Sequence, residues 1–122
     1  MNSDELLKMQ PMELISVLNA EVHFSSMPSL DDEAAYATAN ELLNQATAYI
    51  CYFKQMETAA RIRKREAKRN KEDAAEIDRC MGVEEVFETF KRIAEQQFEL
   101  VTKSFTSKRL VLEEFKQQSK MT

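Results

Sequence analysis

The sequence predicts an all-α fold, in which a long antiparallel helical hairpin, coiled-coil-like, and a short N-terminal helix form a small helical bundle. The 122-residue chain contains one glycine and two prolines, and 31% of its residues are charged, which is the composition of long helices joined by few turns. No segment shows the alternation of apolar and polar residues that is typical of a strand. At this length we expect a single helical domain spanning residues 1–122.

The first long helix is predicted over about residues 30–69. Apolar residues recur there at alternating spacings of four and three, which is the period of a helix packed lengthwise on another helix. Ser29 and Asp32 form a capping-box pattern at its start. About forty residues make a rod of roughly 60 Å, which the rest of the chain must cover. The recurring residues are Ala35, Ala39, Leu42, Ala46, Tyr49, Phe53, Met56 and Ala60.

The second long helix is predicted over about residues 72–118, because its apolar residues also fall on one face at about 100° per residue. If the turn between the two helices lies near Asn70, Phe53 of the first helix lies beside Phe87 of the second, and Ala39 lies beside Val101. Its apolar face consists of Val83, Val86, Phe87, Phe90, Ala94, Gln97, Val101 and Phe105, with Ile93 and Phe98 at the edges.

Two positions remain open for the turn between these helices. We place it near Asn70, because asparagine tolerates the left-handed conformation at a helix end and because this turn brings the aromatic residues of both helices together. The alternative is a turn at Gly82. If the turn is near Asn70, Gly82 lies inside a helix, where it is unfavourable and marks a kink.

A short helix is predicted over about residues 11–24, after a first turn that begins at Ser3. Pro11 suits the first position of this helix, because the N–H that proline lacks has no partner there. The helix has one apolar face. We therefore expect it to cover the open end of the hairpin.

The net charge of −4 is distributed unevenly along the chain. Residues 1–60 carry a net charge of −7, whereas residues 61–71 carry seven basic side chains against Glu66, a net charge of +6. Three interpretations of the basic segment remain open: a solvated tip partly paired with Glu66, Glu72 and Asp73, a contact for nucleic-acid phosphates, or a contact for an acidic protein surface. The candidate contact residues are Arg61, Arg63, Lys64, Arg65, Lys68, Arg69 and Lys71.

An acidic motif offers an enzymatic alternative. Glu84, Glu85 and Glu88 spell EExxE, and carboxylates at this spacing on a helix can hold a divalent metal ion. The motif resembles that of the all-α nucleotide pyrophosphohydrolases, which implies a metal-dependent enzyme. A helical wheel instead places Glu84 and Glu88 opposite the apolar face, where they form a solvated acidic surface with Glu95 and Glu99. We therefore expect no catalysis, no metal site and no cofactor.

Cys51 and Cys80 have no neighbouring metal ligands in the sequence, so we expect both to be small core residues. No apolar run approaches the length that spans a bilayer, and the first residues are acidic where a signal peptide needs a basic start. We therefore expect a cytoplasmic protein with no membrane segment.

Two stretches, ICYFKQMETAARIRKREAKR and ETFKRIAEQQFELVTK, resemble segments of small helical proteins encoded by phages and prophages of gut bacteria. This resemblance implies an accessory role in replication, recombination or counter-defence, in which a protein without catalytic residues occupies a partner's binding surface. The resemblance transfers no site residue.

The favoured function is therefore a non-enzymatic helical module for protein–protein interaction, of the inhibitor type if the resemblance holds. The alternative is a nucleic-acid-binding accessory protein that uses residues 61–71. The identity of the protein partner does not follow from the sequence. We also expect a homo-oligomer, a dimer built along the helices, since the last helix is apolar beyond what one neighbour covers. The surplus residues are Ile93, Phe98, Leu100 and Leu112.

Overall fold

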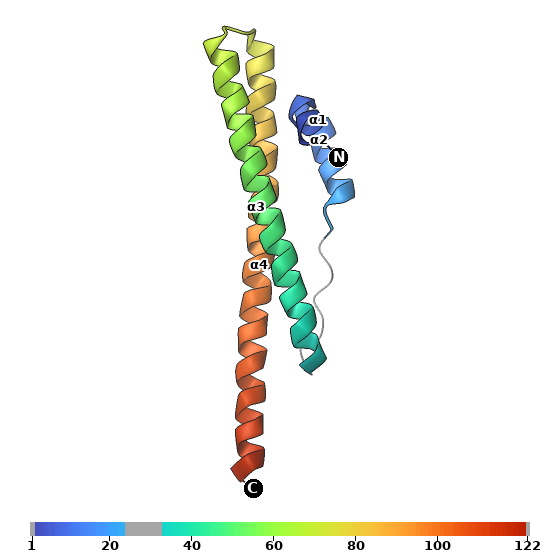
Figure 1. Cartoon of the computed structure of the whole chain (residues 1–122), viewed down its shortest axis with the longest axis vertical. Coiled ribbons are helices and arrows are strands. Elements are labelled where there is room, and N and C mark those ends of the chain that lie inside the picture. The colour runs from blue at the N-terminus through green and yellow to red at the C-terminus, as the bar shows by residue number, and fades with distance from the viewer. Residues whose placement is uncertain (1, 24–32, 122) are drawn as a thin grey trace.

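Two long helices form an antiparallel hairpin, and two short helices pack against one side of it (Figure 1). The computed structural model describes residues 2–23 and 33–121, with side chains for residues 2–23 and 37–103. Every regular element in these residues is a helix, which confirms the all-α hairpin. The helices are α1 (Ser3–Lys8), α2 (Pro11–Glu21), α3 (Glu33–Arg69) and α4 (Ala74–Met121).

The predicted helix boundaries agree with the structure to within a few residues. The helix predicted to run to residue 24 ends at Glu21, and the last helix begins at Ala74 rather than at residue 72. The first short helix is capped by Asn2, whose side-chain Oδ1 accepts a hydrogen bond from the N–H of Asp4 at 3.0 Å. The capping box predicted before α3 lies outside the described residues.

The hairpin turns near Asn70, as predicted, and the alternative turn at Gly82 is wrong. The N–H of Glu72 donates to the carbonyl oxygen of Ala67 at 3.0 Å, which closes the end of α3. The left-handed residue is Lys71, with φ of 54°, and not Asn70. The left-handed conformation falls on Lys71 because of its position in the turn and not because of its residue type. Lys71 is the residue that follows the helix cap, where the chain reverses its direction.

Among the side chains that the structure describes, two apolar clusters of unequal size hold the hairpin. The larger cluster contains Phe53 and Phe87, both fully buried, and Phe90, whose ring centroid lies 5.7 Å from that of Phe53. The smaller cluster, farther from the turn, joins Ala39 of α3 to Val101 of α4. Phe53 therefore shares one cluster with Phe87, and Ala39 shares the other with Val101, as the predicted register requires.

The short helices lie against the half of the hairpin near the turn, and not over its open end as predicted (Figure 1). Leu6 of α1 and both Leu14 and Leu18 of α2 are buried in the same cluster as Phe53 and Phe87. Most of the aromatic side chains that the structure describes in the hairpin are concentrated there. The leucines therefore bury more apolar surface at this position than they would at the thin open end.

Gly82 allows α2 to approach α4 closely. A Cβ atom at Gly82 would lie 2.4 Å from Cγ of Pro11, which is closer than real Cβ contacts allow. The chain's single glycine is thus placed where the first residue of α2 touches α4. This contact accounts for a glycine inside a long helix.

Candidate interaction surface at the hairpin tip

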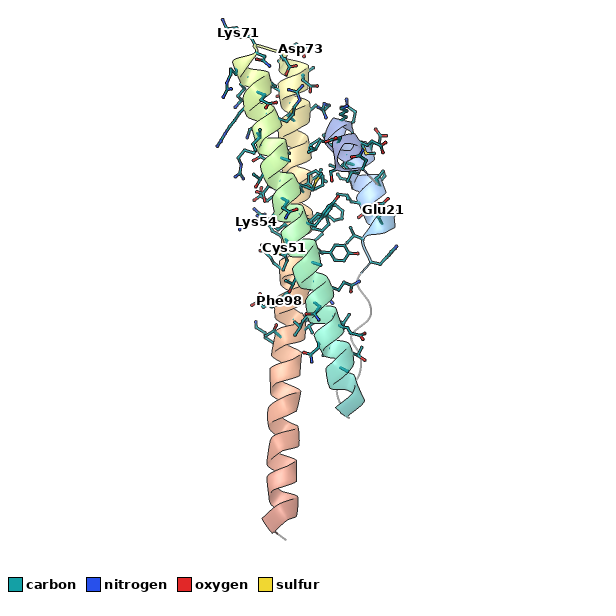
Figure 2. All side chains as sticks on the ribbon, in the orientation of Figure 1. Glu21, Cys51, Lys54, Lys71, Asp73 and Phe98 are labelled. Carbon is teal, nitrogen blue, oxygen red and sulfur yellow. The ribbon has the colours of Figure 1, made fainter. Side chains whose placement is uncertain are left out.

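The seven basic residues predicted as contacts form two groups around the end of α3, which we call the basic tip. Arg65, Lys68, Arg69 and Lys71 are exposed, and among the described residues they form no ion pair. We call these four residues the free cations. Figure 2 shows Lys71 at the turn, where the hairpin projects away from α1 and α2. The exposed tip that the sequence predicted is therefore present.

Arg61 and Lys64 belong to the second group, because both reach across to α4. Nε of Arg61 and Nζ of Lys64 donate to the carboxylate of Glu84 at 2.9 and 2.7 Å. Arg61 also pairs with Glu57 at 3.1 Å, and Glu57 accepts a hydrogen bond from Lys91 at 2.7 Å. These five side chains form one continuous charged chain between the two long helices.

The prediction that Glu84 faces water is wrong, since its side chain is only 14% exposed. Glu84 precedes Phe87 by three residues, which places it at the edge of the buried face rather than opposite it. Burial raises the pKa of Glu84. The hydrogen bonds from Lys64 and Arg61, with the charges of these two residues, together lower the pKa by more than burial raises it, so it lies below its ordinary value. The ionised carboxylate therefore offsets charge at Arg61 and Lys64.

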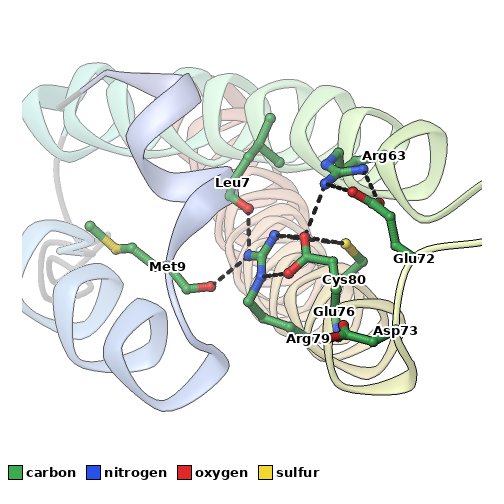
Figure 3. A network of polar contacts seen from close by, with 8 residues as sticks. All are labelled: Leu7, Met9, Arg63, Glu72, Asp73, Glu76, Arg79 and Cys80. Atoms are coloured by element: carbon green, nitrogen blue, oxygen red, sulfur yellow. Dashed lines mark hydrogen bonds and ion pairs between the residues drawn. The ribbon is translucent and has the colours of Figure 1, made fainter. Parts of the chain in front are cut away.

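Arg63 points to the other side of the hairpin, where it holds the start of α4. Its guanidinium donates to both carboxylate oxygens of Glu72, at 2.9 and 3.2 Å, and to Glu76 at 3.1 Å (Figure 3). Of the three acids predicted to pair with the basic segment, only Glu72 does so among the described residues. Asp73 instead caps α4 by accepting the N–H of Glu76 at 3.1 Å.

Arg79 extends this network to the short helices. Its Nη1 donates to the carbonyl oxygens of Leu7 and Met9 at 2.8 and 2.9 Å, and its other nitrogens bind Glu76 (Figure 3). The network satisfies carbonyl groups at the end of α1, which the helix itself leaves without partners. The sequence analysis did not single out Arg79, although it is the one basic residue between positions 72 and 88.

An apolar residue accompanies the free cations. Ile62 is 50% exposed, and its spacing of three and seven residues from Arg65 and Arg69 places all three on one helix face. Residues 61–73 contain no aromatic side chain that could stack on a base. The tip thus offers positive charge next to aliphatic surface.

The carboxylates of the EExxE motif do not converge. Glu84 is bound by α3, Glu88 pairs with Arg92 at 2.6 Å, and Glu85 lines a separate groove between α2 and α4. The described residues contain no group of three or more side chains that could hold a metal ion. The motif is therefore divided among three different environments.

The residues that predicted a dimer are only partly described. Ile93, Phe98 and Leu100 are 42%, 37% and 54% exposed, so α4 does present apolar surface. Ile93 also borders the groove between α2 and α4, which has a volume of about 420 Å³. The side chain of Leu112 lies outside the described residues.

The two cysteines differ in environment. Cys80 is buried, as predicted, whereas Cys51 is exposed in the middle of α3, so the prediction for Cys51 is wrong (Figure 2). Within the described residues, no helix is long and apolar enough to cross a membrane. Comparisons with protein-family models, curated proteins and solved structures find no match to the chain, and its resemblance to phage and prophage proteins stays a prediction.

Proposed function

We propose that the protein is a non-enzymatic helical module that binds another protein through the basic tip. One observation carries this proposal: four free cations and the half-exposed Ile62 lie together at the end of the hairpin. Such a surface suits an acidic protein surface with an apolar centre, because charge steers the encounter and the aliphatic side chain adds contact area.

The contacts of the tip favour a protein over nucleic acid. Carboxylates offset the charge of Arg61, Arg63 and Lys64, which leaves four of the seven predicted contacts available. The whole chain is acidic, with a net charge of −4, so its long-range field repels a polyanion. An aliphatic side chain also gains nothing beside phosphates.

Nucleic acid is the second candidate, and the same free cations support it. Arg65, Lys68 and Arg69 lie within about one turn of helix, so they can follow a phosphate backbone. A metal-dependent enzyme of the pyrophosphohydrolase type is less well supported, because the EExxE carboxylates are held in separate contacts. In our proposal the protein acts without a cofactor.

The deciding variant replaces Arg65, Lys68, Arg69 and Lys71 by glutamine. Its matched control replaces four exposed basic residues elsewhere, namely Lys8, Lys54, Arg92 and Lys103. Both variants should keep the helical circular dichroism of the wild type, because none of these residues is buried. Our proposal predicts that proteins captured from the native host by the wild type are lost with the tip variant and retained with the control.

Retardation of duplex DNA and of RNA at low salt tests the alternative. If the wild type retards nucleic acid with an affinity that falls steeply with salt, and the tip variant does not, the protein-binding proposal fails in favour of nucleic acid. Turnover of nucleoside triphosphates with magnesium, abolished in Glu85→Gln, would contradict the non-enzymatic assignment.

A further inference from the structure

The outer face of α3, opposite the side that packs on α4, carries a lengthwise row of exposed side chains. Its members follow one another at spacings of four, three, four, three and four, which is the spacing of residues through which two helices pack along their lengths. The row covers about five turns of helix, or roughly 27 Å at 1.5 Å per residue. We call it the α3 seam, and its residues are Cys51, Gln55, Thr58, Ile62, Arg65 and Arg69.

The half of the seam far from the turn leaves room for a second helix. Cys51 and Thr58 are small, so a helix can approach there to the short end of the usual interaxial range, about 8 Å. A hollow of about 400 Å³ lies on this face, lined by Cys51, Lys54, Gln55 and Thr58. Figure 2 shows Lys54 on the side of α3 that faces away from α1 and α2. A straight helix that contacts the basic tip can therefore continue along α3 to Cys51.

Positive charge accompanies the seam along its length. Lys54 and the free cations Arg65, Lys68 and Arg69 are exposed, and Glu66 is the one exposed acid in the same stretch of α3. Like the free cations, Lys54 forms no ion pair among the described residues. By contrast, acids outnumber bases among the exposed side chains described for α4. The seam is therefore complementary in charge to a helix that carries carboxylates.

A second copy of the chain does not complement the seam through the same face. In a parallel pair of copies each cation lies beside its own counterpart. In an antiparallel pair centred on the seam, Lys54 of one copy lies near Arg65 of the other, because both residues fall on the same side of the helix at about equal distances from the midpoint of the seam. Both arrangements bring like charges together, which is unfavourable. The occupant that suits the seam is a different chain.

We propose that an acidic helix of another protein docks lengthwise on the α3 seam. Its carboxylates face Arg65 and Arg69 in the basic tip and Lys54 beyond the tip. Its small or aliphatic side chains pack against Thr58 and Ile62. This inference rests on the proposed function, because it gives the shape and the extent of the protein surface that the basic tip binds.

The part of the contact beyond the tip contains one cation, Lys54. An exposed ion pair contributes little to binding on its own, so the loss of Lys54 alone should weaken the contact without abolishing it. The four-residue control of the tip variant, which includes Lys54, is for this reason still expected to retain the captured proteins.

Zero-length crosslinking tests the charge pairing and the helical shape together. A carbodiimide joins a lysine amine to a carboxylate only where the two groups are in contact. Lys54 and Lys68 lie two heptads apart on the same side of the seam. In the complex captured from the native host, we expect both lysines to be joined to carboxylates in one segment of one protein, also about two heptads apart. Mass spectrometry of the linked peptides identifies these positions.

Other linkage patterns overturn the proposal. Links from Lys68 or Lys71 with none from Lys54 mean that the partner contacts the basic tip alone, so this inference fails and the proposed function stands. Links from Lys54 and Lys68 to unrelated segments exclude a single docked helix. A link from Lys54 to a second copy of the chain, recognised with an isotope-labelled copy, assigns the seam to a homo-oligomer instead. The absence of any link from these lysines also excludes the docked helix.

Added carboxylates provide a second test that leaves the basic tip intact. Gln55→Glu with Thr58→Glu places two negative charges in the hollow, whereas the matched control, Gln96→Glu with Thr102→Glu, adds the same charge at exposed positions of α4. A synthetic peptide of the crosslinked segment is the probe, and its fluorescence anisotropy reports binding. We expect the seam variant to bind at least roughly tenfold more weakly than the wild type, and the control to bind within about twofold of it.

The two proposals fail in different ways. If the seam variant binds the peptide as tightly as the control does, the contact ends at the basic tip, so this inference fails while the proposed function stands. If the glutamine variant of the four free cations captures the same proteins as the wild type, the proposed function fails, and this inference fails with it.

Discussion

At Gly82 the absence of a side chain determines how closely α2 can approach α4. Alanine is better than glycine inside a helix by about 1 kcal/mol, so the substitution should be favourable in isolation. In the folded chain the new Cβ would lie 2.4 Å from Cγ of Pro11, at the first residue of α2. The ring of Pro11 is part of the backbone of α2, so it cannot rotate away as a flexible side chain could. The clash can therefore be relieved only by moving α2.

We predict that Gly82→Ala lowers the free energy of unfolding by about 1–3 kcal/mol, the usual cost of overpacking, despite the better helix propensity. Thermal unfolding followed by circular dichroism measures the change. Pro11→Ala removes the clashing atom, so the double variant should be more stable than Gly82→Ala alone. An increase in melting temperature for Gly82→Ala with Pro11 intact would contradict this account of the contact.

The sequence pattern predicted the buried faces of the long helices but not the environment of every site residue. The period of the apolar residues predicts which faces of α3 and α4 are buried, and it does so correctly at Phe53 and Phe87. The same period assigns Glu84 incorrectly, because an edge position becomes buried when the long side chains of Arg61 and Lys64 reach over it. Such reach depends on the distance between two helices, which a single-helix pattern does not contain.

At the scale of elements, one polar network attaches α1 to the hairpin. Arg79 binds the carbonyl oxygens of Leu7 and Met9, and Glu76 holds the Arg79 guanidinium at 2.7 Å. The apolar faces of α1 and α2 would suit either end of the hairpin, and the sequence analysis therefore placed these helices at the wrong end. The contacts of Arg79 and Gly82 select the half near the turn, and these are single residues without a periodic signal.

The network makes the docking of α1 sensitive to acid. The hydrogen bond from Arg79 is the main cause that lowers the pKa of Glu76 from 4.5 to about 2. Because the folded pKa is depressed, the carboxylate stabilises the fold above about pH 4.5, and this stabilisation is lost as the pH falls towards 2. Thermal unfolding across that pH range should therefore show falling stability.

In Glu76→Gln this part of the pH dependence should be smaller, because the residue no longer titrates. Glu95→Gln serves as the control, since Glu95 is exposed and forms no ion pair among the described residues. If Glu76→Gln and Glu95→Gln leave the same acid dependence as the wild type, Glu76 does not couple protonation to docking. Glu84, whose pKa is also lowered, should contribute to the dependence left in Glu76→Gln.

At the scale of the whole molecule, the two apolar clusters formed by the described side chains predict regions of different stability along the hairpin. The larger cluster joins all four helices, with Leu6 and Leu14 packed against Phe53 and Phe87. The smaller one consists of Ala39, Leu42 and Val101, with Leu43 beside it. Buried apolar area is the main source of stability, so the half near the turn must open less often than the other half.

Native-state hydrogen exchange should reveal this difference. We expect backbone amides near Phe53 and Phe87 to exchange at rates set by global unfolding, and amides near Leu42 and Val101 to exchange faster through local opening. Leu14→Ala removes a fully buried side chain at a cost of about 2–5 kcal/mol, so it should accelerate exchange in the protected half. Val101→Ala should accelerate exchange only near the smaller cluster. Equal protection along both helices, or a global effect of Val101→Ala, would mean that the hairpin unfolds as one cooperative unit despite its uneven core.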